Sequence, residues 1–364
     1  MPGPRSGSSP PTSTSLRSRA PGARSRRFST TAPSRGRDMR RLLLTAALVL
    51  AAAPASAFDC AKATTAVERA ICADPALKAA DDAMSAAYAE ARARLDAAGQ
   101  KALRSMQLDW IRLRDGRCSG WDGATAPDAA CLGREIADRT ALLTAAPLRA
   151  GPGAPRFTPV FQRRTDAKAE IDVALAYPQV ADPSTAALRA LNARLAEPAV
   201  GGSPEIDEAA LEGPYTRSLA YRIGYASGRL VSVRFEGYEY TGGAHGMSFT
   251  SGVNFLLQAG RMMATGDLID PARLPALTAY CRARLTAEKR AREVPEELIA
   301  DSLNDEAVNT GLTAVDAWSF DDQGAAVHYD PYVLGAYAEG GYDCAIPWAD
   351  LRPLLKPDAP LPFD

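Results

Sequence analysis

The sequence contains few of the side chains that metal sites and most hydrolases require. Its 364 residues include only two histidines, His245 and His328, and no two cysteines are spaced as Cys-x-x-Cys. Zinc sites commonly use closely spaced Cys and His ligands, so we expect no metal site. Residues 58–364 also lack Gly-x-Ser-x-Gly and His-Glu-x-x-His, the motifs of α/β-hydrolases and zinc peptidases. We therefore predict no catalytic residue, no cofactor and no enzyme activity.

A hydrophobic segment long enough to span a membrane is also missing near the N-terminus. The apolar run over residues 42–53 is much shorter than the ~20 residues that a spanning helix needs. It follows the basic Met39-Arg40-Arg41 and precedes Pro54 and the small residues 55–57. This order is typical of a secretory signal peptide over residues 39–57. We expect a periplasmic or secreted protein whose mature chain does not insert stably into membranes.

The first 57 residues differ in charge from the rest of the chain. They hold ten of the 42 basic residues and one of the 43 acidic residues. Residues 1–38 are rich in Ser, Pro, Gly and Arg, which predicts disorder, and a translation start at Met39 is the alternative explanation for them. Residues 58–364 keep 32 basic and 42 acidic residues, a net charge of about −10. This charge disfavours nucleic acid and favours cationic partners, although it also serves solubility alone.

Six cysteines lie in the expected mature chain. An even number of cysteines in an exported protein predicts disulfide bonds. The sequence does not fix their connectivity, but the spacing pattern suggests the pairs Cys60–Cys72, Cys118–Cys131 and Cys281–Cys344.

Residues 58–145 are Ala-rich with helical periodicity and predict an all-α domain stapled by disulfides. Thr65 and Glu68 are spaced as a capping box, which satisfies free amides at a helix start. Asp74-Pro75 places an N-cap residue and a first-turn proline at the start of a second helix, which we expect to end at Gly99.

The rest of the chain predicts a second domain of a different class. Residues 146–159 form an expected Pro/Gly linker, and residues 160–364 an α+β domain with an antiparallel sheet and helices. The expected strands are 170–177, 219–225, 230–240, 247–257, 261–263, 314–320, 325–329 and 342–347, and the expected helices are 184–197, 272–290 and 295–309.

The helical half carries a recognisable set of motifs. They are Phe58-Asp59-Cys60, Val67-Glu68-x-Ala70-Ile71-Cys72, and Gln107-x-x-Trp110-x-x-x-Arg114-Asp115 with Cys118. Residues 58–145 resemble the LprI-type lysozyme-inhibitor N-terminal domain family, which implies its fold and lysozyme as a partner. The named inhibitor is a lipoprotein, whereas Cys60 here is not preceded by a lipoprotein signal. Trp110, Arg114 and Asp115 are interpreted as core packing with a local salt bridge, with partner contact as the alternative.

Residues 165–355 carry a second set of motifs in a specific order. They are Tyr240-Thr241-Gly242-Gly243-Ala244-His245-Gly246, Asn254-Phe255 through Gly260 to Asp267-Leu268, and Asp330-Pro331-Tyr332 through Gly340 to Ile346-Pro347-Trp348-x-Asp350-Leu351. This half resembles the C-terminal domain shared by the anti-sigma factor RsiV and many exported proteins of unknown function. RsiV binds lysozyme through this type of domain.

The glycine-rich stretch is the candidate binding loop, formed by Gly242, Gly243, His245 and Gly246. Glycine permits positive φ and close backbone approach, so the loop could present His245 to a partner. The alternative is a tight bend whose histidine caps a backbone group. A hydrolytic pair of His245 with His328 is conceivable only from the rarity of histidine.

Two hypotheses of function follow. The first is an exported cell-envelope binding protein, a lysozyme inhibitor or lysozyme-binding protein, whose partner is lysozyme or another cationic envelope protein. The second is a peptidoglycan-related envelope enzyme or accessory protein. Hydrolysis of muropeptides by the purified protein distinguishes the second from the first.

The signal peptide generates the first testable prediction. Ala55-Ser56-Ala57 presents small side chains at the cleavage positions, so the exported protein should begin within a few residues of Phe58. N-terminal sequencing of exported material checks this, and a retained Met39 contradicts it.

Overall fold

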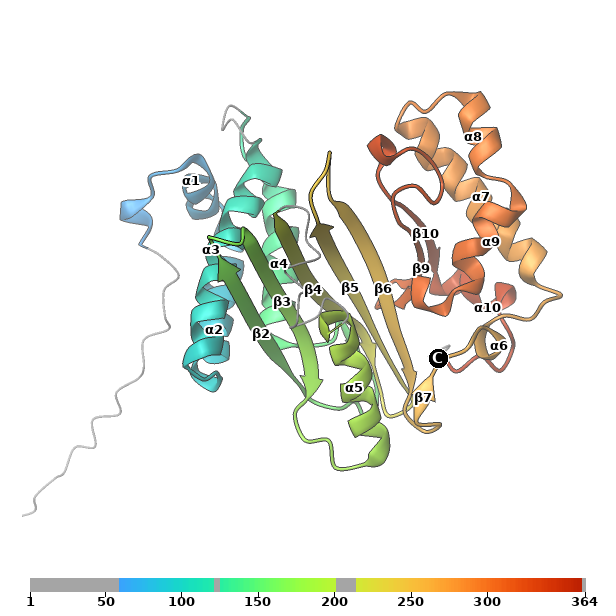
Figure 1. The fold of residues 1–364 in the computed structure, drawn as a ribbon, viewed down its shortest axis with the longest axis horizontal. Helices are drawn as coiled ribbons and strands as arrows, with labels where there is room; N and C mark the ends of the chain where they lie inside the picture. The colour runs from blue at the N-terminus through green and yellow to red at the C-terminus, as the bar shows by residue number, and fades with distance from the viewer. Residues whose placement is uncertain (1–58, 121–124, 201–213, 362–364) are drawn as a thin grey trace, which may run out of the picture. The chain divides into compact units, whose positions relative to one another are not determined.

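The computed structural model describes residues 59–120, 125–200 and 214–361. The expected signal peptide and the residues before it lie outside these ranges. The description below concerns the described residues of the unit that spans 53–364 (Figure 1). Within the described ranges, no helix combines the length and the apolar character needed to cross a membrane.

The first part of the described chain is all-α, as predicted. Its elements are η1 (Cys60–Lys62), α1 (Ala66–Ala73), α2 (Pro75–Arg94), α3 (Ala97–Ser119) and α4 (Ala129–Thr144). The capping box is confirmed, because the Thr65 hydroxyl accepts the Glu68 amide and the Glu68 carboxylate accepts the Thr65 amide. Asp74 caps α2 as expected. The prediction for Gly99 was wrong: it lies in the first turn of α3, where its amide donates to the Asp96 side chain.

All three suggested disulfide pairs are confirmed. Cys60–Cys72 and Cys118–Cys131 lie within the helical part, with Cα–Cα distances of 5.8 and 5.5 Å. Cys281–Cys344 joins α7 to β10 with a Cα–Cα distance of 5.4 Å. No described cysteine is free.

A seven-stranded sheet follows the helices. Its order is β2-β3-β4-β5-β6-β7, with β1 paired to β4. Neighbours are antiparallel except at β3–β4 and β1–β4. The strands are β1 (Arg149–Ala150), β2 (Phe157–Asp166), β3 (Ile171–Val180), β4 (Tyr215–Ala226), β5 (Leu230–Tyr240), β6 (Met247–Leu256) and β7 (Arg261–Met262).

The segment 146–159, expected to be a linker, contains β1 and the start of β2. The Leu148 amide donates to the Ile223 carbonyl at 2.9 Å, so the chain joins the sheet directly after α4. Pro159 lies within β2, which sequence reasoning missed. A proline is tolerated there because β2 is an edge strand, where a missing amide need not break the ladder.

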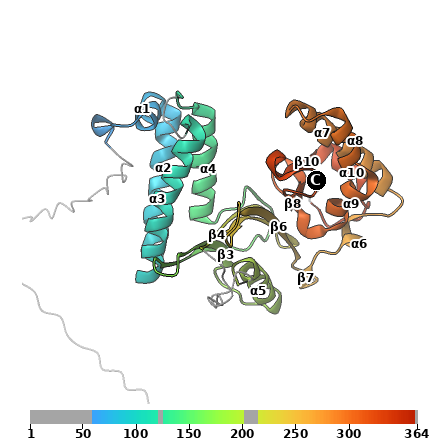
Figure 2. The same ribbon diagram turned by 45° about the horizontal axis from the view of Figure 1, so that its top comes forward.

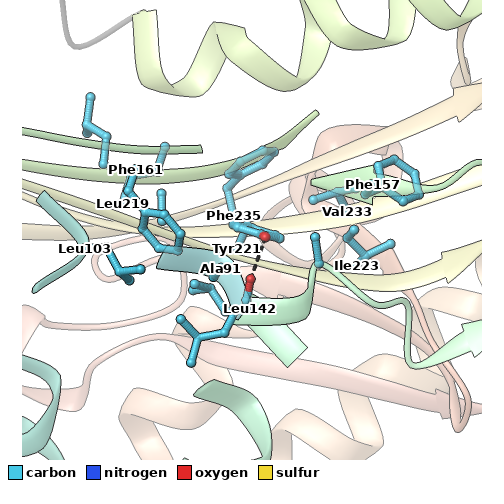
Figure 3. Close-up of a cluster of buried hydrophobic side chains, with 14 of the residues drawn as sticks. Ala91, Leu103, Leu142, Phe157, Phe161, Leu219, Tyr221, Ile223, Val233 and Phe235 are labelled. Atoms are coloured by element: carbon cyan, nitrogen blue, oxygen red, sulfur yellow. Dashed lines mark hydrogen bonds between the residues drawn. The ribbon is translucent and has the colours of Figure 1, made fainter. Parts of the chain in front are cut away.

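The helices and the sheet share one hydrophobic core. Leu103 of α3, Leu142 of α4, Phe161 of β2 and Phe235 of β5 all belong to it (Figure 3). The Tyr221 hydroxyl, on β4, donates to the Leu142 carbonyl at 2.7 Å inside this core. Helix α5 (Ala186–Val200) packs mainly against β3, and Figure 2 shows it on the other side of the sheet from α2–α4.

The C-terminal part has its own core and a second sheet. Its three strands are antiparallel in the order β10-β9-β8, and Trp318, Phe320 and Cys344 are fully buried in the core. The elements are α6 (Thr265–Leu268), α7 (Leu274–Ala291), α8 (Glu296–Ser302), α9 (Asp305–Thr313), η3 (Val315–Ala317), β8 (Trp318–Phe320), β9 (Gly324–Tyr329), η4 (Tyr337–Glu339), β10 (Tyr342–Pro347) and α10 (Trp348–Leu354).

The predicted fold class is confirmed, with two local corrections. The helix expected over 295–309 is two helices, because the Asn304 side chain accepts the Ala307 amide and starts α9. The strand expected over 314–320 begins only at Trp318, since residues 315–317 form a turn of 3₁₀ helix.

The hydroxyl of Tyr221 provides a stability test for the joint core. Tyr221→Phe should lower the free energy of unfolding by about 1–2 kcal/mol, because a buried hydrogen bond to α4 is lost. The matched control is Tyr238→Phe, since Tyr238 is 37% exposed and water can replace its hydroxyl contacts. Urea denaturation of both variants measures the difference, and equal effects would contradict the assignment.

Candidate functional site

Two loops far apart in sequence meet beside the first sheet. The first connects β5 to β6 and carries the predicted glycine-rich stretch, and the second follows β9. The Tyr337 hydroxyl donates to the Gly246 carbonyl at 2.8 Å. The Thr250 amide donates to the Asp330 carboxylate at 2.8 Å. The first and third sequence motifs of this half are therefore brought together, since Gly246 belongs to the first and Tyr337 to the third.

His245 is held by tyrosines of the second loop. Its ring stacks on that of Tyr337, with the centroids 3.7 Å apart. The Tyr332 hydroxyl lies 3.3 Å from His245 Nε2, and Nδ1 lies 3.1 Å from the Gly246 carbonyl oxygen. The histidine thus contacts a backbone group, as in a tight bend, but its side chain stays exposed and lies against two aromatic rings.

The glycines of the loop are needed for its shape. Gly242 and Gly243 have φ values of 95° and 91°, in the region that L side chains rarely adopt. A Cβ on Gly246 would lie 2.4 Å from the Tyr238 ring, so this position requires a close approach. The sequence predicted special backbone at these residues, and the structure shows it.

The two loops that meet at His245 carry exposed aromatic and apolar side chains. We define the aromatic patch as Tyr238, His245, Met247, Tyr332, Val333 and Tyr337. Tyr332 is 56% exposed and has a φ of 74°, a strained value for a bulky residue. Backbone strain and exposed large apolar side chains both concentrate at functional sites, so the patch is the candidate binding surface.

A buried ion pair fixes the second loop. Lys289 on α7 has no exposed surface, and its Nζ donates to Glu339 Oε2 at 2.6 Å. The Tyr342 hydroxyl donates to the same oxygen at 2.7 Å, and the Ala336 amide donates to Oε1. Burial opposes ionisation of Glu339, but these hydrogen bonds and the Lys289 charge lower its pKa to about 2. Glu339 therefore anchors the residues on either side of Tyr337.

The motif Trp110, Arg114 and Asp115 lies in the helical part. The Arg114 guanidinium is buried, donates to Asp115 from Nε at 2.8 Å and stacks 5.0 Å from the Trp110 ring centroid. Its Nη1 also lies 4.0 Å from Asp81 Oδ1. Burial raises the pKa of Asp81 despite the nearby Arg114 charge. These contacts correspond to core packing with a local salt bridge.

A surface depression of about 510 Å³ lies between α1 and α3 of the same part. Its lining includes Val67, Leu108, Ile111 and Asp115. Leu108 is 60% exposed, the highest value among the exposed large hydrophobic residues of the described chain. This depression is a second candidate contact surface.

The two histidines have different partners. His328 Nε2 lies 2.8 Å from Ser319 Oγ, and its Nδ1 lies 2.7 Å from Asp343 Oδ1. Sequence reasoning missed this group because its members lie on three strands without a shared motif. Pairing of the two expected strands 325–329 and 342–347 could have placed His328 beside Asp343. Among the described residues, no cluster of three or more His, Cys, Asp or Glu could hold a metal ion.

Three family models match the chain in succession. Residues 60–143 match the model described as lysozyme inhibitor LprI. Residues 164–248 match deacetylase PdaC, and residues 266–349 match DUF3298, a family of unknown function. The predicted resemblance of the helical half is thus confirmed. In the second half, the first match covers strands of the seven-stranded sheet and the second covers the three-stranded sheet. A comparison with curated proteins gives no match.

Solved structures of the DUF3298 family are similar to part of the chain. One, from Pseudomonas aeruginosa PAO1, has 15% sequence identity and a TM-score of 0.41, covering 56% of this chain and 96% of that chain. Another, from Bacteroides fragilis NCTC 9343, has 20% identity and a TM-score of 0.40, covering 56% and 94%.

The buried ion pair generates a prediction of stability and pH dependence. Glu339→Gln leaves Lys289 buried without a counter-ion and should cost about 3–5 kcal/mol of unfolding free energy. In the unchanged protein, the folded pKa of Glu339 is about 2, below its ordinary 4.5. Its stabilisation is therefore present above pH 4.5 and is lost as the pH falls toward 2.

Chemical denaturation between pH 7 and pH 3 measures both effects. Glu296→Gln is the matched control, because Glu296 forms an exposed pair with Arg290 and should change stability little. A Glu339→Gln variant as stable as this control would contradict the assigned role.

Proposed function

We propose that the protein is an exported cell-envelope binding protein that binds and inhibits a lysozyme. The match of residues 60–143 to the family described as lysozyme inhibitor LprI carries this proposal. The match is supported by two disulfides and the capping box, which fall in the same range.

Export to an oxidising compartment is supported by the cysteines. Three disulfides pair every described cysteine, and such bonds persist outside the cytoplasm. Together with the expected signal peptide, they favour the periplasm or the medium as the place of action.

The charge of the expected mature chain suits a basic partner. A net charge of about −10 on residues 58–364 attracts a cationic enzyme over distances near the Debye length. Such steering raises the association rate more than it lengthens the lifetime of the complex.

The aromatic patch is the proposed contact surface of the C-terminal half. Exposed tyrosines on a fixed backbone make strong contacts, because they bury a large area and lose little conformational entropy. The Lys289–Glu339 pair holds Tyr337, which in turn stacks on His245. We propose that the patch binds a partner and performs no chemistry of its own. Leu108 and the depression beside it are the corresponding surface of the helical half.

One specific observation supports the second hypothesis, a peptidoglycan-related enzyme or accessory protein. Residues 164–248 match a family described as a deacetylase, which favours an envelope enzyme or accessory protein acting on peptidoglycan. Hydrolysis or deacetylation of muropeptides by the purified protein would favour this alternative.

A binding experiment with several lysozyme classes tests the proposal. Tyr332→Ala should weaken affinity about 10–100-fold if the patch is a hot spot. Leu298→Ala, at an exposed residue on α8 outside the patch, is the matched control and should bind normally. Leu108→Ala reports the contribution of the helical half. Stopped-flow association should slow between 0.01 and 0.15 M salt as the Debye length falls from ~30 to ~8 Å.

His245→Ala separates the two interpretations of the glycine-rich loop. A partner contact predicts weaker binding with little change in the melting temperature, whereas a structural bend predicts lower stability with normal binding. No binding to any lysozyme class at micromolar concentration would remove the inhibitor proposal.

A further inference from the structure

Ser319, His328 and Asp343 lie on one face of the three-stranded sheet. His328 of β9 is directly opposite Asp343 of β10, and Ser319 of β8 is opposite Ala326, two residues before the histidine. Side chains two residues apart on a strand share a face, so the register alone places the three together. The opposite face carries the buried Trp318, whose neighbours form the core.

The hydrogen bonds join these groups in a specific order. Asp343 Oδ1 lies 2.7 Å from His328 Nδ1, and Ser319 Oγ lies 2.8 Å from Nε2. A carboxylate can only accept from Nδ1–H, which leaves Nε2 as the acceptor for the serine hydroxyl. This is the arrangement of a nucleophile, a general base and a group that orients the base.

The charges around the group keep the orienting carboxylate ionised. Partial burial opposes ionisation of Asp343, but the hydrogen bond from His328 and the charges of Arg234 and Arg292 lower its pKa. The His328 side chain is 4% exposed, while Asp343 is 56% exposed and Ser319 is partly exposed. The base is therefore shielded, and the nucleophile remains within reach of solvent.

The first sheet approaches the group from β5 and β6. The Phe320 amide donates to Ser232 Oγ at 3.0 Å, and a Cβ on Gly252 would lie 2.2 Å from the Trp318 carbonyl oxygen. Arg234 is two residues beyond Ser232 on β5 and is paired in register with Gly252. Its charge helps to lower the pKa of Asp343, although the guanidinium also pairs with Glu236. The Phe320 amide is already engaged by Ser232. Carboxylic esters are the suitable class, because the alcohol of an ester leaves more readily than the amine of an amide.

We propose that Ser319, His328 and Asp343 form a second functional site that hydrolyses carboxylic esters. Ser319 Oγ bonds to the carbonyl carbon as His328 Nε2 takes its proton. The carbon–oxygen bond to the leaving alcohol then breaks, and Nε2 returns the proton to that oxygen. Water repeats the sequence on the acyl-serine, which releases the carboxylic acid and restores the serine.

The site is independent of the proposed lysozyme binding. The aromatic patch includes His245, whereas the ester site uses His328, and the hydrogen bonds of the two histidines have no partner in common. Failure of either proposal therefore leaves the other intact.

Covalent labelling of the exported protein tests the site. A fluorophosphonate probe should modify Ser319, located by mass spectrometry, and the protein should hydrolyse p-nitrophenyl acetate. Ser319→Ala should abolish the label and lower turnover at least about 100-fold. Ser218→Ala, at an exposed serine on β4, is the matched control and should change neither.

Asp343→Asn provides a second variant at an exposed residue, should Ser319→Ala fail to fold. It should lower turnover about 100-fold or more while keeping the melting temperature and lysozyme binding of the unchanged protein. Absence of labelling at Ser319, or ester turnover equal in Asp343→Asn and the unchanged protein, overturns the proposal.

Discussion

The buried ion pair of Lys289 and Glu339 is the interaction on which the candidate binding surface depends. A lysine without exposed surface must find a partner, because an isolated buried charge costs several kcal/mol. Glu339 supplies that partner and also accepts from Tyr342 and from the Ala336 amide. One carboxylate therefore joins α7, β10 and the loop that carries Tyr337. The exposed stack on His245 is thereby supported from inside the C-terminal core.

A buried polar network joins the two sheets in a similar way. Asn254 Nδ2 donates to the Trp318 carbonyl at 2.7 Å and to the Val315 carbonyl at 2.9 Å. Its Oδ1 accepts from the Ser232 hydroxyl, which itself accepts the Phe320 amide. Backbone groups that the short strand β8 leaves without ladder partners are satisfied by these two side chains. Gly252 permits the approach, since a Cβ there would collide with Trp318.

Local chemistry made much of the fold predictable, and long-range packing explains what was missed. The helix starts at Thr65 and Asp74 were predictable, because the capping side chains bind backbone amides only two or three residues away. The prediction at Gly99 failed because Asp96 caps a new helix, α3, and Gly99 lies in its first turn. Pro159 falls in the expected linker, and so the edge strand β2 was not predicted. At the site, the glycine loop was evident, but its contacts with Tyr332 and the grouping of Ser319, His328 and Asp343 needed strand register from the folded chain.

The disulfide between Cys281 and Cys344 makes the stability of the three-stranded sheet depend on the redox conditions around the protein. It joins residues 63 positions apart and links β10 to α7. Restricting the unfolded chain in this way stabilises the folded state by about 4 kcal/mol. In a reducing environment this bond is absent, so the strand bearing Asp343 is held only by its ladder with β9 and by packing. Oxidising conditions add this bond, so the C-terminal core reaches its full stability only where disulfides persist.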